Sequence, residues 1–389
     1  MLMVFVTVQA IGLDRLPVDQ LPKSAELPNP FVLANGSTVK TPEDWKKRRD
    51  EIADIILTYE FGQLPPKVDH VKSSVVKTIA TTRPTEMPGV TEQDVLLETG
   101  PKDEIKIPLK LYIPASPLDS KNRKFPIIIR GDLGWGPVKN EILYEVVNRG
   151  YILAQFDRTV LHIDKNAIRT GGVFDAWPDY KGSASSAWAW GYHRVVDYVI
   201  TRDDVDAKKI AITGHSRGGK AVLLAGALDE RIAMVAPNGS GCGGAGCYRF
   251  QAPKSEAIEN IVAKFPYWFE PNFHEFIGHV DQLPFDQHYL KALCAPRAYL
   301  ETNALGDLWA NPEGSQQSWR AGKEVFDFLG ATDQIGIGWR EGKHEHNLRD
   351  WSTLIDFADY RFFGKQANRS FTTLAFPASE KKFSWTKPQ

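Results

Sequence analysis

A serine between two glycines forms the stretch of this sequence most suggestive of chemistry. Residues 214–218 read G-H-S-R-G; a short apolar run precedes them at residues 210–212, and small and apolar residues follow at 221–227. This order predicts a buried strand, a tight turn and a packed helix, the arrangement called a nucleophile elbow. Glycines suit both sides of Ser216 because so tight a turn leaves little room for side chains. The alternative is an ordinary glycine-rich turn between a strand and a helix.

A serine hydroxyl becomes a nucleophile only when a base removes its proton, and the base needs an acid to orient it. In α/β-hydrolases the order along the chain is serine, acid, histidine, each on a loop after a later strand. Two histidines, His344 and His346, follow the last predicted strand. We favour His344 as the base because Gly342 leaves the loop free to turn it inward. His346 stays open as the base, as does the alternative that both are solvated loop histidines.

The acid of such a triad should follow the strand predicted at residues 297–302. Asp307 lies a few residues past the end of that strand and is the favoured acid. Glu301 lies within the strand and is expected to point elsewhere, and Glu313 is the reserve candidate. A lone aspartate is often a solvated or capping residue, so position and chain order together favour Asp307.

Two cations accompany the serine. Arg217 directly follows Ser216, where the backbone N–H is the usual oxyanion donor and the guanidinium adds positive charge. Lys220 lies four residues after Ser216, one helical turn on, and can face the same cleft. This pair suggests a substrate with acid or dense hydroxyl character. The alternative is that both cations pair with acids on the helix surface.

The elements around these residues predict a single α/β domain over residues 1–389. Apolar runs at residues 125–130, 151–156, 210–212, 234–236, 297–302 and 335–339 alternate with helical patterns, whereas residues 71–80, 94–99 and 105–113 suit antiparallel edge strands. Such alternation favours a mostly parallel central sheet with helices on both faces, and together with the elbow it favours the α/β-hydrolase fold. Residues 41–44 (T-P-E-D) predict a capped helix start. We expect an extended arm over residues 11–40 and a long irregular excursion over 248–290.

Composition describes an ordinary globular protein with 42% apolar and 24% charged residues. The formal net charge of −1 offers no basic face, so we expect no nucleic-acid partner and no membrane partner. We also expect a monomer. No apolar run reaches the length of a membrane span. The high count of eleven tryptophans favours a carbohydrate ligand, because aromatic side chains form flat surfaces on which sugar rings stack.

The apolar start of the chain and its cysteines bear on localisation. Residues 1–10 end in V-Q-A, a pattern like a signal-peptidase site, and predict a truncated signal peptide on a secreted or periplasmic protein. A frayed apolar terminus or first strand is the alternative. Three cysteines make no disulfide framework; a bridge between Cys242 and Cys247 stays open, and their spacing matches no zinc signature.

Several longer motifs are more specific than the elbow alone. They are G-H-S-R-G-G-K at 214–220, A-W-A-W-G-Y-H-R at 187–194, N-G-S-G-C-G-G-A-G-C-Y-R at 238–249, F-P-Y-W-F at 265–269, L-P-F-D-Q-H-Y-L-K-A-L-C-A-P-R at 283–297 and G-D-L-W-A-N-P-E-G at 306–314. With them the chain resembles carbohydrate esterase family 15, the glucuronoyl esterases, and in particular its bacterial branch. The similarity extends from about residue 40 to residue 363.

The resemblance implies a serine esterase that needs no cofactor. Such enzymes cleave the ester between lignin alcohols and the 4-O-methyl-glucuronic acid groups of xylan, so the implied partner is glucuronoxylan or a lignin–carbohydrate ester. The roles that it implies are Ser216 as nucleophile, His344 as base, Arg217 in the oxyanion hole, Lys220 and Glu256 on the sugar hydroxyls, and Trp309 stacked near the sugar.

One position departs from the family pattern. Many members place the catalytic glutamate just before the S-G-x-G-G run, where this chain has Gly239. The resemblance then implies that Asp307 is the catalytic acid, a placement that some bacterial members use. The range of substrates that the protein accepts stays open. Two other functions remain: an acetyl-xylan or other small-acyl carbohydrate esterase, and a non-catalytic carbohydrate-binding protein on the same fold.

Overall fold

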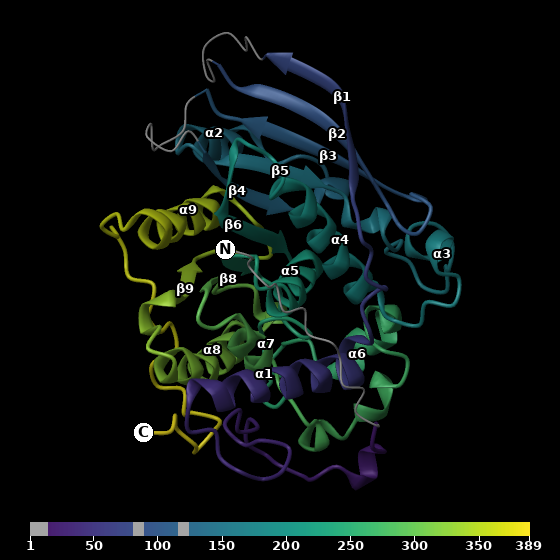
Figure 1. Cartoon of the computed structure of the whole chain (residues 1–389). Coiled ribbons are helices and arrows are strands. Elements are labelled where there is room, and N and C mark those ends of the chain that lie inside the picture. Colours follow the sequence, from purple (N-terminus) through teal and green to yellow (C-terminus); the bar gives the residue numbers. More distant parts are fainter. Residues whose placement is uncertain (1–14, 81–88, 116–123) are drawn as a thin grey trace.

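The computed structural model describes residues 15–80, 89–115 and 124–389, and the signal-peptide prediction for residues 1–10 lies outside them. Within these residues nine strands form one sheet in the order β1-β2-β3-β5-β4-β6-β7-β8-β9 (Figure 1). The strands are β1 (Lys72–Ala80), β2 (Thr91–Thr99), β3 (Ile105–Ile113), β4 (Phe125–Arg130), β5 (Ile152–Phe156), β6 (Val205–His215), β7 (Met234–Asn238), β8 (Ala298–Ala304) and β9 (Ile335–Arg340).

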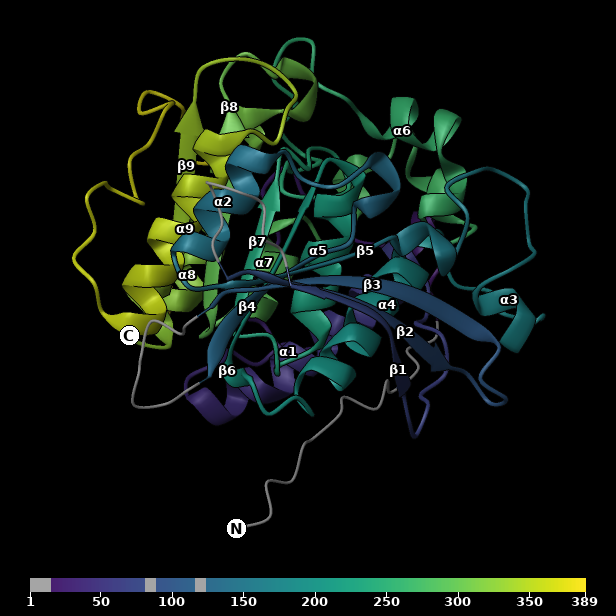
Figure 2. The same ribbon diagram turned by 90° about the horizontal axis from the view of Figure 1, so that it is seen from above.

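The sheet is antiparallel at one edge and parallel through its centre. Strands β1, β2, β3 and β5 pair antiparallel, whereas β5, β4, β6, β7, β8 and β9 pair parallel. Every residue of β4, β5, β7 and β8 is buried, which explains the mostly apolar sequences of β4, β5 and β7. Seen from above, β1–β3 and β8–β9 run in different directions, the twist expected of such a sheet (Figure 2). The predicted mostly parallel central sheet is confirmed.

Helices cover both faces of the sheet, as the sequence predicts. The helices α2 and α9 lie on one face, and α1, α4, α5, α7 and α8 on the other (Figure 1). The helices are α1 (Pro42–Ile56), α2 (Asn140–Asn148), α3 (Val173–Ala176), α4 (Ala184–Val199), α5 (Arg217–Leu228), α6 (Ile258–Lys264), α7 (His288–Cys294), α8 (Pro312–Phe328) and α9 (Leu348–Phe363).

The start of α1 follows the predicted capping chemistry. The Thr41 hydroxyl accepts from the Asp44 backbone N–H at 3.1 Å, and the Asp44 carboxylate accepts from the Thr41 backbone N–H at 3.0 Å. Each side chain thus satisfies a backbone donor that the first turn of a helix leaves without a partner. The helix continues into a π-helical turn at Leu57–Phe61, a form often found at functional sites.

The excursion over residues 248–290 is more regular than predicted. It contains α6, three short 3₁₀ turns and the start of α7. These helices are only a few residues long, so their apolar periodicity is too brief to recognise in the sequence. Buried aromatic rings hold the segment in place, among them Trp268, Phe269 and Phe273. The N-terminal arm, described from residue 15, contains a short 3₁₀ turn at Val18–Gln20 and an isolated bridge between Val32 and Thr38 before α1.

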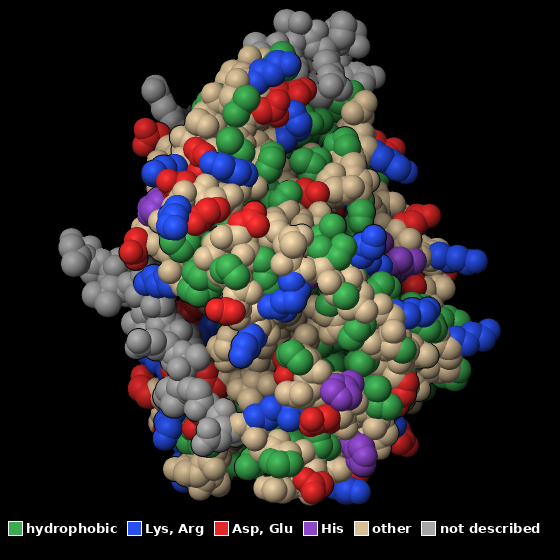
Figure 3. Space-filling model, turned by 90° about the vertical axis from the view of Figure 1, so that its right-hand side faces the viewer, with side chains coloured by type: hydrophobic (Ala, Val, Ile, Leu, Met, Phe, Trp, Pro, Cys, Tyr) green, Lys and Arg blue, Asp and Glu red, His purple; other side chains and the backbone are tan. Residues whose placement is uncertain are grey.

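The surface carries charges of both signs. On the face drawn in Figure 3, Lys and Arg side chains are interspersed with Asp and Glu side chains. This mixture agrees with the formal net charge of −1. Among the helices of the described residues, none has the length and apolar character needed to cross a membrane.

Candidate active site

Ser216 lies at the junction of β6 and α5 in a strained backbone conformation. Its φ is 56° and its ψ is −123°, a combination that residues other than glycine rarely adopt. A Cβ at Gly214 would lie 2.6 Å from the Gly218 carbonyl oxygen, and a Cβ at Gly218 would lie 2.0 Å from Asp132 Oδ1. Both neighbours must therefore be glycine. The predicted strand, sharp turn and helix are all present.

A buried carboxylate braces this turn from the neighbouring strand. Asp132 follows β4, is fully buried, and accepts a hydrogen bond at 2.9 Å from the His215 backbone N–H. Its other oxygen accepts from the buried Arg158 guanidinium. Asp132 lies in the loop over residues 131–136 that is predicted at the position of an oxyanion hole, directly after a buried strand, but its role as a brace was not predicted.

The structure brings the predicted acid and base together. Asp307 follows β8 and His344 follows β9, and His344 Nδ1 donates to Asp307 Oδ2 at 2.6 Å. The Asp307 side chain is 7% exposed and that of His344 43%, so a shielded carboxylate orients an accessible imidazole. When Nδ1 carries the proton, neutral His344 has Nε2 free to accept one. That is the arrangement a general base needs.

The alternatives considered for base and acid lie in different surroundings. His346 stacks on Trp351, with ring centroids 5.0 Å apart, and burial lowers its pKa well below the usual value. Glu301 is buried in β8, 2.6 Å from the Lys291 ammonium, and Glu313 lies in the first turn of α8. The structure thus pairs Asp307 with His344; their roles in a reaction stay predictions.

His215, directly before the serine, is a neutral neighbour of His344. The two ring centroids lie 4.4 Å apart, and His215 Nδ1 lies 2.6 Å from Asn238 Oδ1. Burial, reinforced by His344, lowers the pKa of His215 to about 4. His215 therefore places no positive charge beside His344 at neutral pH.

The Arg217 guanidinium is held in one direction by an acid and by aromatic rings. Its Nη1 donates to Asp164 at 2.9 Å, and Asp164 also accepts from Tyr267 at 2.8 Å and Trp268 at 3.0 Å. Burial alone would raise the pKa of Asp164. The Arg217 charge and these hydrogen bonds have the larger effect, so the pKa of Asp164 is lowered. Asp164 therefore stays ionised, and Arg217 has a fixed partner. The rings of Trp268 and Phe265 lie 4.5 and 4.8 Å from the guanidinium carbon.

Lys220, Glu256 and Trp309 form one cluster beside the elbow. The buried Lys220 ammonium donates to the carbonyls of Ser240 and Cys242, which contradicts a pairing on the helix surface. Burial lowers the pKa of Lys220, opposed by the Glu256 carboxylate, and burial raises the pKa of Glu256, opposed by Lys220. The Glu256 backbone N–H donates to the Trp309 carbonyl at 3.0 Å. Trp309 itself is 46% exposed, so its ring is accessible.

A second buried carboxylate lies behind this cluster. Glu60, in the π-helical turn after α1, is fully buried, and one of its oxygens accepts from Tyr248 at 2.7 Å and from Gln287 at 2.6 Å. Burial raises the pKa of Glu60 to about 8, although both hydrogen bonds and the Lys220 charge oppose the shift. Glu60 therefore keeps its proton in the folded state over a pH range in which an exposed glutamate loses it.

This raised pKa predicts a pH dependence of stability. The contribution from Glu60 is fully present below about pH 4.5 and is lost as the pH rises through about 8. Glu60→Gln, which cannot titrate, should therefore reduce the fall in the free energy of unfolding between pH 5 and 8. Urea unfolding at several pH values measures this slope. Glu43→Gln, at an exposed position of α1, is the control and should keep the slope of the unmodified protein. Equal slopes in all three proteins would contradict the prediction.

The described residues show no site for a metal ion and no disulfide. Among them, no group of three or more His, Cys, Asp or Glu side chains could hold a metal. Cys242, Cys247 and Cys294 are free and buried, so the bridge left open by the sequence is not formed.

Known proteins resemble this chain over most of its length. The family model described as glucuronyl esterase of fungi matches residues 100–330, more than half of the chain. The chain belongs to the glucuronoyl esterase family. It is 30% identical to a 4-O-methyl-glucuronoyl methylesterase of Phanerochaete carnosa, over 88% of this chain and 82% of that protein.

Solved structures of carbohydrate esterase family 15 share the fold. The chain matches a glucuronoyl esterase of this family from Caldicellulosiruptor kristjansonii with a TM-score of 0.79 and 30% identity, over 93% of this chain and 97% of that one. It also matches a promiscuous esterase of the family from a marine bacterial metagenome, with a TM-score of 0.74 and 28% identity, over 88% and 98%. The family recognised from the motifs and the predicted α/β-hydrolase fold are both confirmed.

Proposed function

We propose that this chain is a serine esterase that cleaves the ester between a 4-O-methyl-glucuronic acid group and an alcohol. The observation that carries the proposal is the hydrogen-bonded pair of Asp307 and His344. The His344 ring centroid lies 4.4 Å from that of His215, the residue before the serine held in an elbow with φ of 56°. Membership in the glucuronoyl esterase family supports the choice of acyl group.

The proposed reaction proceeds through an acyl-enzyme. His344 takes the proton of the Ser216 hydroxyl as the serine oxygen attacks the ester carbonyl carbon. The Arg217 backbone N–H and guanidinium stabilise the negative charge that develops on the carbonyl oxygen. The alcohol then leaves with the proton from His344. Water, deprotonated by His344, attacks the acyl-enzyme, and Ser216 regains its proton as the uronic acid is released.

The cluster of Lys220, Glu256 and Trp309 is the proposed site for the sugar ring. Lys220 has three N–H donors, and two backbone carbonyls accept from it, so one donor can serve a sugar hydroxyl. Glu256 is a buried acceptor next to it, and the exposed Trp309 ring offers an apolar face. A charged donor, an acceptor and an aromatic face together suit a polyhydroxylated ring.

The natural substrate in this proposal is glucuronoxylan ester-linked to a lignin alcohol. Such a polymer lies outside the cell, so the proposal includes a secreted or periplasmic protein. The proposed functional unit is a monomer. A second candidate function is the cleavage of other small acyl groups, such as acetyl esters of xylan. It is favoured by Gly239, which departs from the family pattern, and by the similarity to a promiscuous member of the family.

Two substrates and one variant test the proposal. We expect the protein to hydrolyse benzyl glucuronate much faster than 4-nitrophenyl acetate. Lys220→Met should raise the KM for benzyl glucuronate at least about tenfold, because a charged hydrogen bond contributes ~1.5–3 kcal/mol, and should change the KM for the acetate far less. Steady-state kinetics on both esters measures this.

The control is Lys209→Met, because Lys209 pairs with Asp206 away from the elbow, and it should leave both KM values unchanged. If the acetate were the better substrate, the second function would replace the first. If Lys220→Met raised the KM values for both esters by the same factor, Lys220 would act on the fold or the transition state and not on the sugar.

A further inference from the structure

His215, the residue directly before Ser216, is held both at its backbone and at its side chain. Its backbone N–H donates to Asp132 Oδ2 at 2.9 Å, and Asp132 follows β4. Its ring atom Nδ1 lies 2.6 Å from Asn238 Oδ1, and Asn238 is the last residue of β7. Since β4 and β7 are the two strands that pair with β6, His215 is linked to both neighbours of its own strand.

The amide of Asn238 can face His215 in only one way. Its Nδ2 donates to Thr302 Oγ1 at 2.8 Å and to the Thr302 carbonyl oxygen at 3.3 Å. A carbonyl oxygen only accepts hydrogen bonds, so the amide nitrogen faces Thr302 and the amide oxygen faces His215. The amide oxygen also only accepts, so His215 Nδ1 carries the proton and Nε2 of the neutral ring does not. Thr302 thus fixes the tautomer of His215 through Asn238.

The ring of His215 packs against the ring of the proposed base. Its centroid lies 4.4 Å from that of His344, at an interplanar angle of 42°, and 6.0 Å from that of His346. His344 belongs to a loop whose residues 341–345 are all exposed. The His215 ring therefore gives the His344 ring a fixed surface to lie on, in addition to the hydrogen bond with Asp307.

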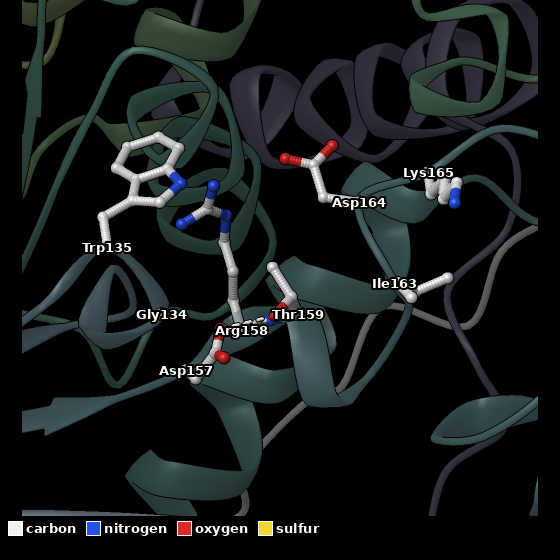
Figure 4. A pocket seen from close by; sticks show the side chains of 8 residues that line it. All are labelled: Gly134, Trp135, Asp157, Arg158, Thr159, Ile163, Asp164 and Lys165. Atoms are coloured by element: carbon white, nitrogen blue, oxygen red, sulfur yellow. Dashed lines mark hydrogen bonds between the residues drawn. The ribbon is translucent and has the colours of Figure 1, made fainter.

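Trp135, in the turn after β4, also packs against His215. The two ring centroids lie 6.4 Å apart at an interplanar angle of 78°. In Figure 4 the side chains of Trp135 and Arg158 lie next to each other at a hollow of about 340 Å³ lined by residues that follow β4 and β5. The guanidinium carbons of Arg158 and Arg217 lie 4.6 and 5.9 Å from the Trp135 ring centroid. These contacts hold Trp135, and Trp135 restrains the tilt of the His215 ring.

The neutral state of His215 suits a position beside the base. Burial, reinforced by His344, lowers the pKa of His215 to about 4. The hydrogen bond with Asn238 and the carboxylates of Asp132 and Asp307 oppose this shift but do not cancel it. A general base becomes positively charged when it takes the serine proton, and a second positive ring with its centroid 4.4 Å away would oppose that step.

We propose that His215 is a positioning residue for His344: a neutral ring, fixed by Asn238 and Thr302, on which the base lies during the reaction. The inference rests on the proposed function, in which His344 takes and returns the proton of Ser216. His215 touches no reacting atom in this proposal. It fixes the nucleophile through the backbone, as its neighbour in the chain, and the base through its ring.

Three variants test the ring and its hydrogen bond separately. His215→Ala removes the ring and should lower kcat for benzyl glucuronate at least about tenfold, because a small displacement of a catalytic group is costly. His215→Phe keeps a flat ring and should retain kcat to within about threefold. Asn238→Leu leaves Nδ1–H without an acceptor and should lower kcat about threefold or more. The KM should change less than about twofold in all three variants, because the sugar is held elsewhere.

NMR of the protein with ¹⁵N-labelled histidine rings measures the tautomer directly. In the unmodified protein His215 should have a protonated Nδ1 and an unprotonated Nε2 between about pH 5 and 8. Asn238→Leu should shift the proton toward Nε2, because Nδ1–H loses its acceptor. The signals of His215 are those that disappear in His215→Phe.

The control is His70→Ala, because His70 is exposed and lies 2.9 Å from Asp103 before the edge strand β1; it should leave kcat unchanged. Unchanged kcat in His215→Ala, or a proton on Nε2 of His215 in the unmodified protein, overturns the positioning role while glucuronate hydrolysis continues. Equal losses of kcat in folded His215→Ala and His215→Phe also overturn it, with thermal unfolding as the measure of folding. Failure of the unmodified protein to cleave benzyl glucuronate would instead overturn the proposed function.

Discussion

Ser216→Ala is expected to lower kcat for glucuronate esters by about 10⁶, the effect of removing the nucleophile from a triad whose other parts remain. The substitution removes only the hydroxyl oxygen and keeps the Cβ, so the turn at φ of 56° is as strained with alanine as with serine. The midpoint of thermal unfolding and the affinity for glucuronic acid should therefore stay close to those of the unmodified protein. Kinetics, thermal unfolding and calorimetric titration measure the three quantities.

A second serine provides the control. Ser185 is buried in α4 and its hydroxyl has no hydrogen-bond partner among the described residues. Ser185→Ala should leave turnover unchanged and should not reduce stability, since a buried hydroxyl without a partner contributes no stabilising bond. Appreciable turnover by Ser216→Ala would mean that another residue carries the chemistry.

Asp307→Ala should lower kcat by about 10⁴, because His344 loses the carboxylate that fixes its tautomer and stabilises its protonated form. Glu313→Ala is the control on the same segment, since Glu313 lies in the first turn of α8. If Asp307→Ala were nearly silent and Glu313→Ala were not, the acid would be misassigned.

Gly239 allows a sharper form of this test. A Cβ at Gly239 would lie 3.6 Å from Asp307 Oδ2 and 3.6 Å from the His215 ring, so a side chain there starts beside the present carboxylate. Gly239→Glu in the Asp307→Ala background should restore part of the lost kcat. The recovery should be incomplete, because a φ of 48° costs an L-residue about 1–2 kcal/mol. No recovery would show that the two placements of the acid are not interchangeable.

The parts of the site that the sequence predicts are those with a local signal. The elbow has its glycines within residues 214–218, and Asp307 and His344 follow apolar strands at the expected places in the chain order. Each of these signals lies within a few residues, where the period of apolar residues and the turn chemistry suffice. The antiparallel edge and the helix cap at Thr41 were predictable for the same reason.

The parts that the sequence does not predict depend on partners far apart in the chain. The bond from the His215 backbone to Asp132 spans 83 positions, and that between Tyr248 and Glu60 spans 188. The burial of Lys220 against two carbonyls likewise depends on how the loop after β7 folds over α5. No local period encodes such contacts, which is why a surface ion pair for Lys220 was a reasonable but wrong alternative.

The buried carboxylate under the elbow links the position of Ser216 to the unfolding of the sheet. Asp132 and Arg158 follow two different central strands and are both fully enclosed, and removing one partner of a buried ion pair costs about 3–5 kcal/mol. The turn that carries Ser216 cannot open locally without breaking a hydrogen bond to this pair. The turn that carries Ser216 is therefore expected to open together with the centre of the sheet and not by itself.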